Sequence, residues 1–213
     1  SGGDAINTAC MCMQSGKADI MLAVGAESVL CPLVIYSLAN AKALSRRNDS
    51  PSTASRPFDV TRDGFVIGEG GGALVLETEE HALARGAKIY AEIRGCGNTD
   101  DAYHVTAPHP EGRGAIACMK QAIAEAGINP SDIGYINAHG TATNKGDTVE
   151  ASSIKKVFGN TLPYVSSTKG ATGHMMGAGG ITETITCVKA IETGTVPPTI
   201  NLNEVDPECA GID

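Results

Sequence analysis

Residues 134–143 read GYINAHGTAT, a short apolar run that ends in His139 and two hydroxyl side chains. Residues 164–174, YVSSTKGATGH, show a similar pattern of a short apolar start followed by small and hydroxyl residues. They carry Lys169 and His174. In both segments the apolar run predicts a short strand followed by a turn of small residues. Ligands of α/β proteins bind beyond the carboxyl ends of strands, so both segments indicate a functional site.

The rest of the chain alternates between helical and strand patterns, which is typical of the α/β class. Gly-bearing turns precede a helix near the start and again near residue 170, which favours two structurally related halves. We therefore predict two domains, residues 1–85 and 86–213. The run from Ala18 to Val24 is apolar throughout, which predicts a strand covered on both faces. The periodicity predicts helices over 4–15, 33–44, 79–85, 114–126, 149–158 and 181–191, and strands over 18–24, 65–77, 89–93, 135–138 and 164–167.

Composition excludes several classes of function. The 213 residues carry a formal net charge of −8, which argues against a nucleic-acid surface. No stretch is long and apolar enough for a membrane span, and no signal peptide is visible. Seven Cys without a second metal-binding pair are typical of thiols in a reducing cytosol, so the CxC at Cys10 and Cys12 does not predict zinc.

Two histidines in matching positions point to chemistry, although a single His is more often structural. A neutral imidazole can donate its N–H to an oxygen that develops negative charge, and a nearby Lys⁺ favours the neutral form by lowering the pKa of the ring. Glu150 and Glu183 fall on the helices that follow each segment, where a carboxylate can pair with Lys169 or simply face solvent. The segments contain no nucleophile with a placed base, so this site is predicted to be incomplete.

The motifs resemble those of one family, the beta-ketoacyl-acyl-carrier-protein synthases, and most closely its type II elongating members. This resemblance implies a layered thiolase-like α/β fold of two pseudo-duplicated halves, with this chain cut at both ends. It covers the whole chain and rests on NAHGTAT (137–143), SSTKGATGH (166–174), RPFDVTRDGFVIGEGGGALVLE (56–77), DAYHVTAPHPEG (101–112) and VPPTINLNEVDPEC (196–209).

The resemblance also implies roles for individual residues. His139 and His174 match the two histidines of the family. Residues 1–6 look like those directly after the nucleophilic Cys, which places that Cys roughly two positions upstream of Ser1. Cys10 lies too deep in the first predicted helix to be the nucleophile. Further residues match supporting or binding positions of the family: Lys169 with Glu183 as a charged pair, Thr141 and Thr143 on the phosphopantetheine arm, Phe65 near the acyl channel, and Asn137 with Glu183 around a structural cation of some members.

The reaction implied is a ping-pong condensation. The Cys accepts an acyl group from acyl carrier protein, malonyl-carrier-protein loses CO2, and the resulting carbanion attacks the acyl thioester. The resemblance implies a cytoplasmic homodimer without metal or organic cofactor, because the pantetheine arrives on the substrate. An acidic carrier protein needs a basic docking patch, for which Lys42, Arg46 and Arg47 are candidates, or else they form an ordinary solvated helix end.

Four alternatives stay open. A ketosynthase domain of a polyketide assembly line does the same chemistry on other chains. A non-catalytic chain-length subunit usually alters the histidines, and His139 with His174 argues against it. A thiolase shares the fold, but Lys169 and the two histidine motifs favour a decarboxylating synthase. A binding module without catalysis fits only if the full-length protein lacks the Cys.

Overall fold

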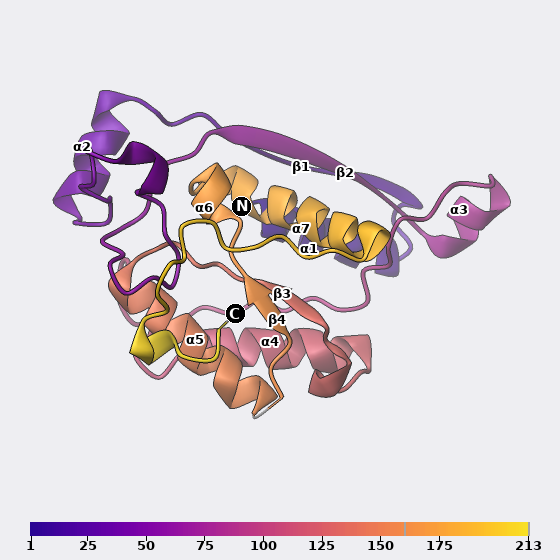
Figure 1. Ribbon diagram of the computed structural model, residues 1–213. Helices are drawn as coiled ribbons and strands as arrows, with labels where there is room; N and C mark the ends of the chain where they lie inside the picture. Colours follow the sequence, from indigo (N-terminus) through magenta and orange to yellow (C-terminus); the bar gives the residue numbers. More distant parts are fainter. Residues whose placement is uncertain (160, 213) are drawn as a thin grey trace. The chain divides into compact units, whose positions relative to one another are not determined.

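The computed structural model describes residues 1–159 and 161–212 as two compact units, each made of several chain segments (Figure 1). The first unit comprises residues 1–29, 68–93 and 175–195. The second comprises residues 30–67, 94–174 and 196–213. The predicted boundary between residues 85 and 86 stays a prediction, and its end at residue 213 lies outside the described residues.

The first unit is built on an antiparallel pair of strands. Strand β1 (Ile20–Glu27) pairs with β2 (Gly70–Glu77), and Leu22 lies opposite Val75. Helices α1 (Gly2–Gln14) and α7 (Met176–Thr193) pack against this pair. Its core consists of Ile6, Ala9, Ala23 and Ile181.

Gly2 lets α1 approach α7 closely. A Cβ at this position would lie 2.8 Å from the backbone nitrogen of Ile181 and 3.0 Å from the carbonyl oxygen of Gly177. Both distances are shorter than a van der Waals contact, so a side chain here would push the two helices apart. Gly2, predicted from the sequence to lie in a turn before the first helix, thus lies within α1 and serves helix packing in this unit.

One face of β1 differs from the prediction. Ala23 is buried, but Leu22 and Val24 on the opposite face are 63% and 52% exposed. Successive side chains of a strand point to opposite faces, so the helices α1 and α7 cover only one of them. A continuous apolar run therefore did not establish burial on both faces within the described residues.

The second unit is built on a parallel pair of short strands. Strand β3 (Tyr135–Asn137) pairs in register with β4 (Tyr164–Ser166). Helices α4 (Arg113–Ala126) and α5 (Asn144–Phe158) pack on each other, and Figure 1 shows them side by side. Its fully buried core is Phe58, Ala138, Ala151, Ile154, Val165, Cys209 and Ile212.

The remaining elements are short. Helix α3 (Glu79–Ala84) belongs to the first unit, and α2 (Pro32–Asn40) and α6 (Lys169–Thr172) belong to the second. The described part of the second unit also contains three 3-10 turns: η1 (Pro51–Thr53), η2 (Pro130–Asp132) and η3 (Pro207–Cys209).

The strand predicted over residues 89–93 is absent from the described structure. The neighbouring segment pairs with a helix instead: the backbone N–H groups of Cys96 and Asn98 donate to the side chains of Glu125 and Gln121 on α4. A strand requires a backbone ladder to a partner, and its side-chain pattern alone cannot supply one.

Other element boundaries moved for local reasons. Strand β2 begins at Gly70 rather than residue 65, since the preceding residues make only isolated bridges. Helix α2 ends at Asn40, and Lys42 with φ of 55° does not continue it. Helix α5 begins five residues earlier than predicted, because its polar first turn carries no apolar periodicity.

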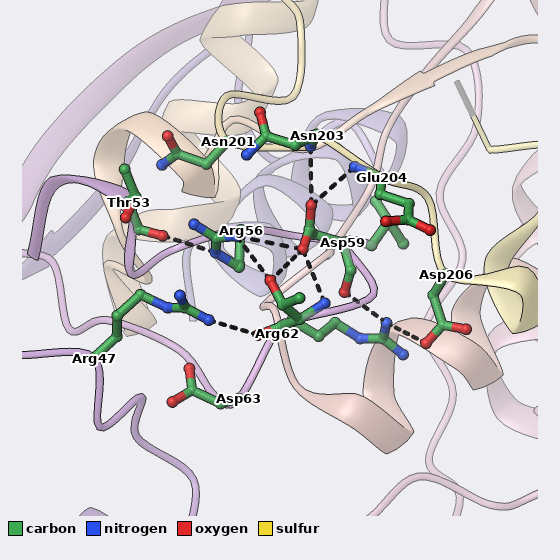
Figure 2. A network of polar contacts seen from close by, with 12 residues as sticks. Arg47, Thr53, Arg56, Asp59, Arg62, Asp63, Asn201, Asn203, Glu204 and Asp206 are labelled. Carbon is green, nitrogen blue, oxygen red and sulfur yellow. Dashed lines mark hydrogen bonds and ion pairs between the residues drawn. The ribbon is translucent and has the colours of Figure 1, made fainter. Parts of the chain in front are cut away.

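A buried polar network fixes the segment before β2 in the second unit (Figure 2). The carboxylate of Asp59 accepts hydrogen bonds from the backbone N–H groups of Thr61, Asn203 and Glu204 at 2.9–3.1 Å. Burial alone would raise the pKa of this carboxyl, but these hydrogen bonds hold it well below its ordinary value. The network therefore ties residues 56–62 to the segment after residue 200.

Asp59→Ala is expected to lower the free energy of unfolding by about 3–5 kcal/mol, because it leaves several buried donors and the Arg56 guanidinium without their acceptor. Chemical denaturation at pH 7 measures this loss. The exposed Asp63→Ala is the control and should lose much less. Since the folded pKa of Asp59 is depressed, its contribution should be present above about pH 4 and fade as the pH falls. Equal losses in both variants would contradict the prediction.

Among the helices of residues 1–159 and 161–212, none has the length and apolar content that crossing a bilayer requires.

Candidate active site

The two histidines singled out by the sequence meet in the second unit. The rings of His139 and His174 have centroids 5.2 Å apart and stand at 87° to each other. Parallel strands end at the same edge, so β3 delivers His139 beside the turn that follows β4. The ladder continues one step past the strands, where the N–H of Ala138 donates to the carbonyl of Ser166 at 2.8 Å.

His174 is held by the segment that precedes β2. Its backbone N–H donates to the carbonyl of Val66 at 2.7 Å, and the residue forms a parallel bridge with Ile67. The ring of Phe65 contacts the His174 ring edge-on, with centroids 5.2 Å apart. Phe65 is 8% exposed, and its place near an acyl channel stays a prediction.

Two carboxylates of α5 hold the turn that carries His139. Glu150 accepts hydrogen bonds from the N–H groups of His139 and Gly140, both at 2.7 Å. Asp147 accepts from the N–H of Thr141 at 3.0 Å and from the N–H of Phe58 at 2.8 Å. These hydrogen bonds hold the backbone of the turn in place and so fix the position from which the His139 side chain extends.

Ser167 connects the two histidine-bearing turns. Its hydroxyl donates to the carbonyl of Gly140 at 2.7 Å and accepts the N–H of Lys169 at 3.2 Å. Ser167 is completely buried, so both hydrogen bonds are shielded from water. The sequence pattern did not single out Ser167, and in the structure it links the two turns.

Both imidazoles are neutral at pH 7. His139 retains solvent contact, but protein atoms crowd its ring, and this loss of hydration lowers its pKa to about 3, assisted by the charges of Lys169 and His174. Loss of hydration and then the Lys169 charge lower the pKa of His174 to about 4. Lys169 is 2% exposed, so little solvent screens its charge. Two neutral N–H donors can therefore converge on one oxygen.

The two carboxylates of α5 lie in a contrasting environment. Burial raises the pKa of Glu150 to about 7, against the opposing effect of the Gly140 and His139 N–H groups. Burial likewise raises the pKa of Asp147 to about 6, although Phe58 and the Arg62 guanidinium lower it. Shifted titration of this kind clusters at functional sites and supports this location.

Two hydroxyls lie where the His139 turn enters α5. The side-chain oxygens of Thr141 and Thr143 hydrogen-bond to each other at 3.0 Å. Asn137, one strand position before the turn, has a buried amide whose oxygen and nitrogen have no hydrogen-bond partner in the described structure. The sequence-predicted residues of this segment therefore gather within one short stretch of the second unit.

Glu183 lies on α7 in the first unit, whereas Lys169 and Asn137 lie in the second. Its pairing with either residue stays a prediction. Within the described part of the chain, no group of three or more His, Cys, Asp or Glu residues is arranged to bind a metal ion.

The basic candidates divide into two kinds. Lys42 and Arg46 are exposed, and both follow the end of α2. Arg47 points inward instead: its guanidinium donates to the carbonyl of Thr61 at 2.9 Å and its Nε is buried (Figure 2). Arg47 therefore belongs to the structural network, which the sequence alone did not indicate.

Models of one protein family match nearly the whole chain. The model described as "Beta-ketoacyl synthase, N-terminal domain" matches residues 1–82. The model described as "Beta-ketoacyl synthase, C-terminal domain" matches residues 90–203.

Individual proteins agree with these matches. The 3-oxoacyl-[acyl-carrier-protein] synthase 2 of Synechocystis sp. is 50% identical over 98% of this chain and 51% of its own length. The protein of the same name from Coxiella burnetii is 50% identical over 96% of this chain and 50% of its own length.

Solved structures give the same result. A beta-ketoacyl synthase of Burkholderia phymatum matches with a TM-score of 0.94 at 42% identity, over 100% of this chain and 51% of its own. A ketosynthase of a type II polyketide synthase, solved with its acyl-carrier protein, matches with a TM-score of 0.94 at 42% identity, over 98% of this chain and 52% of its own. This chain spans about half the length of these relatives. The matches confirm the predicted thiolase-like α/β fold.

Proposed function

Because the chain belongs to the beta-ketoacyl synthase family, we propose that it forms part of a 3-oxoacyl-acyl-carrier-protein synthase that elongates fatty acids by decarboxylative condensation. The observation that carries this proposal is the pair of neutral imidazoles, His139 and His174, beside the buried charge of Lys169. Two neutral N–H donors suit an enolate oxygen, whose negative charge appears only during the reaction.

The reaction proceeds in two halves. A thiolate directly upstream of residue 1, the position that the resemblance implies, attacks an acyl thioester and releases the carrier thiol. The malonyl thioester then loses CO2, and the electron pair of the broken C–C bond becomes an enolate on the thioester oxygen. His139 and His174 hydrogen-bond this oxygen. The enolate carbon attacks the acyl-Cys, the Cys thiolate leaves, and a 3-ketoacyl thioester results.

The other residues support this chemistry. Lys169, with Glu183 as the partner implied by the family, holds the imidazoles neutral, and Glu150 fixes the backbone under His139. Thr141 and Thr143 bind the pantetheine arm, and Phe65 borders the acyl group. No metal or organic cofactor takes part. The working form is a homodimer in the cytoplasm.

The proposal is tested by assaying the full-length protein with an acyl-carrier protein and malonyl-carrier protein, and weighing the product by mass spectrometry. A 3-ketoacyl product two carbons longer than the primer is expected. The Coxiella burnetii relative serves as the positive control. A well-folded protein that forms no such product, while the control does, would rule the proposal out.

A polyketide ketosynthase remains the second candidate, favoured by the structural match to the type II polyketide enzyme. The relatives at 50% identity are named 3-oxoacyl-[acyl-carrier-protein] synthase 2, and this name supports the main proposal. Saturated acyl primers as preferred substrates would favour fatty acid elongation, and preference for a polyketone primer would favour the alternative.

Docking of the acidic carrier protein is assigned to Lys42 and Arg46, the two exposed cations after α2. Reversing both charges, Lys42→Glu with Arg46→Glu, is expected to raise KM for the carrier substrate about tenfold at low salt, and less at about 1 M salt. Lys120→Glu, an exposed site on α4, is the control. Steady-state kinetics at both ionic strengths decide the matter. A salt-independent rise, or the same rise in the control, would contradict this docking site.

A further inference from the structure

Gly146 lies in the first turn of α5, three residues after Thr143, which is the N-cap of this helix. Glycine in a helix is less favourable than alanine, so a glycine at a helical position calls for a physical reason. The φ angle of Gly146 is not positive, so its backbone conformation does not require glycine. The reason is steric, because a Cβ at Gly146 would lie 2.3 Å from the Oγ1 of Thr143.

The Thr143 hydroxyl, which this Cβ would overlap, already forms a hydrogen bond. The Oγ1 of Thr143 lies 3.0 Å from the Oγ1 of Thr141, in a hydrogen bond between the two side chains. The same added Cβ would lie 3.7 Å from the Oγ1 of Thr141, an ordinary contact, so the overlap falls on Thr143 alone. Thr141 is 6% exposed and has little room to follow a displaced partner.

Thr143 can escape the overlap only by changing its side-chain rotamer. Its backbone is the N-cap of α5, and its side chain makes no capping bond there. A branched side chain has few χ1 positions, so a rotation carries the hydroxyl away from Thr141 in one large step. Neighbouring Asp147 stays anchored to the N–H groups of Phe58 and Thr141, which leaves the backbone of this turn in place.

We infer that Gly146 is a positioning residue, whose missing side chain keeps the Thr143 hydroxyl paired with Thr141 so that the two bind one pantetheine arm together. This inference rests on the proposed function, and it adds a residue that itself touches no substrate. It follows that the identity of residue 146 sets how tightly the carrier-borne substrate is held.

Gly146→Ala in the full-length protein tests this. The variant should raise KM for malonyl-carrier-protein about tenfold while kcat changes less than twofold, because the histidines are untouched. Alanine is a better helix former, which offsets the loss of the hydrogen bond between Thr141 and Thr143, so the free energy of unfolding should change little, and this separates the effect from misfolding. Gly134→Ala is the matched control: a Cβ there meets no atom within 4 Å, its φ is not positive, and KM should not change.

A double-substitution cycle completes the test. Thr143→Ala removes the hydroxyl and makes room for a Cβ at residue 146, so adding Gly146→Ala to it should have no further effect on KM. Equal effects of Gly146→Ala in both backgrounds would overturn the inference, as would an unchanged KM in an active protein. If the wild-type protein forms no 3-ketoacyl product, the proposed function fails. The rotamer of Thr143 in a crystal structure of Gly146→Ala then still decides the steric claim.

Discussion

His139→Ala or His174→Ala in the full-length protein is expected to reduce decarboxylation of malonyl-carrier-protein by about 10²–10³-fold, the cost of removing one oxyanion donor. The rings lie 5.2 Å apart and both are neutral at pH 7, so each contributes an N–H to the same developing charge. Either donor alone leaves the enolate oxygen with one of its two hydrogen bonds from the protein.

Release of labelled CO2 from malonyl-carrier-protein measures this step separately from condensation. Transfer of the acyl group to the Cys should survive in part, because that half of the reaction forms no enolate. His81→Ala, on α3, is the control and should leave both steps unchanged. Wild-type decarboxylation by either active-site variant would remove the proposed roles of the histidines.

The position of this pair could be predicted because it depends on a simple rule. Parallel strands end at one edge, so two strands that each end in a histidine motif bring the histidines together. The residues along 135–139 and 164–174 predict that both histidines lie near this edge, whereas the backbone contacts of His174 with Val66 and Ile67 come from a distant segment. Phe65 followed from family resemblance rather than from any pattern, and the structure places its ring against His174.

The supporting contacts could not be predicted in this way. Asp147 binds the backbone of Phe58, which lies 89 residues away in the sequence, and Ser167 binds the carbonyl of Gly140. Backbone groups are the same at every residue, so no residue type marks them as partners. The signal that could have pointed to Asp147 is its place in the first turn of α5, near the donors of a helix start.

The fold shows a similar division. Helix α4 was predicted within one residue, because its apolar stripe and terminal Gly127 are local features. The strand predicted at 89–93 failed because a strand depends on a partner, and Ile89 and Ile93 remain 48% and 40% exposed in the described structure. Local signals thus establish helices well, whereas sheet pairing depends on distant segments.

Lys169→Met is expected to raise the pKa of both His139 and His174 by roughly one unit or more, the usual effect of removing a like charge nearby. The Lys169 charge is a cause of the depressed pKa at both rings, and at 2% exposure it is poorly screened. Loss of hydration remains in the variant, so neither pKa should return fully to about 6.5. NMR titration of the imidazoles measures the shift directly, and the exposed Lys120→Met is the matched control.

The consequence for activity has a definite sign. A protonated imidazole would pair with the malonyl carboxylate and stabilise the ground state, whose charge disperses as CO2 leaves, so decarboxylation should slow. In the wild type this loss of activity begins only near pH 4. In Lys169→Met it should begin at higher pH, and the activity ratio of variant to wild type should fall from pH 7 to pH 5.

The acid sensitivity of the fold should change in the opposite direction, with the variant losing less stability than the wild type as the pH falls. Unfolded histidines bind protons near pH 6.5 and the folded ones only near pH 3–4, so acid destabilises the wild-type fold across this window. A higher folded pKa narrows the pH range in which only the unfolded histidines bind protons. Urea denaturation at pH 7 and pH 5 should therefore show a smaller decrease in the free energy of unfolding for the variant. Unchanged titration midpoints would show that Lys169 does not set the charge state of the pair.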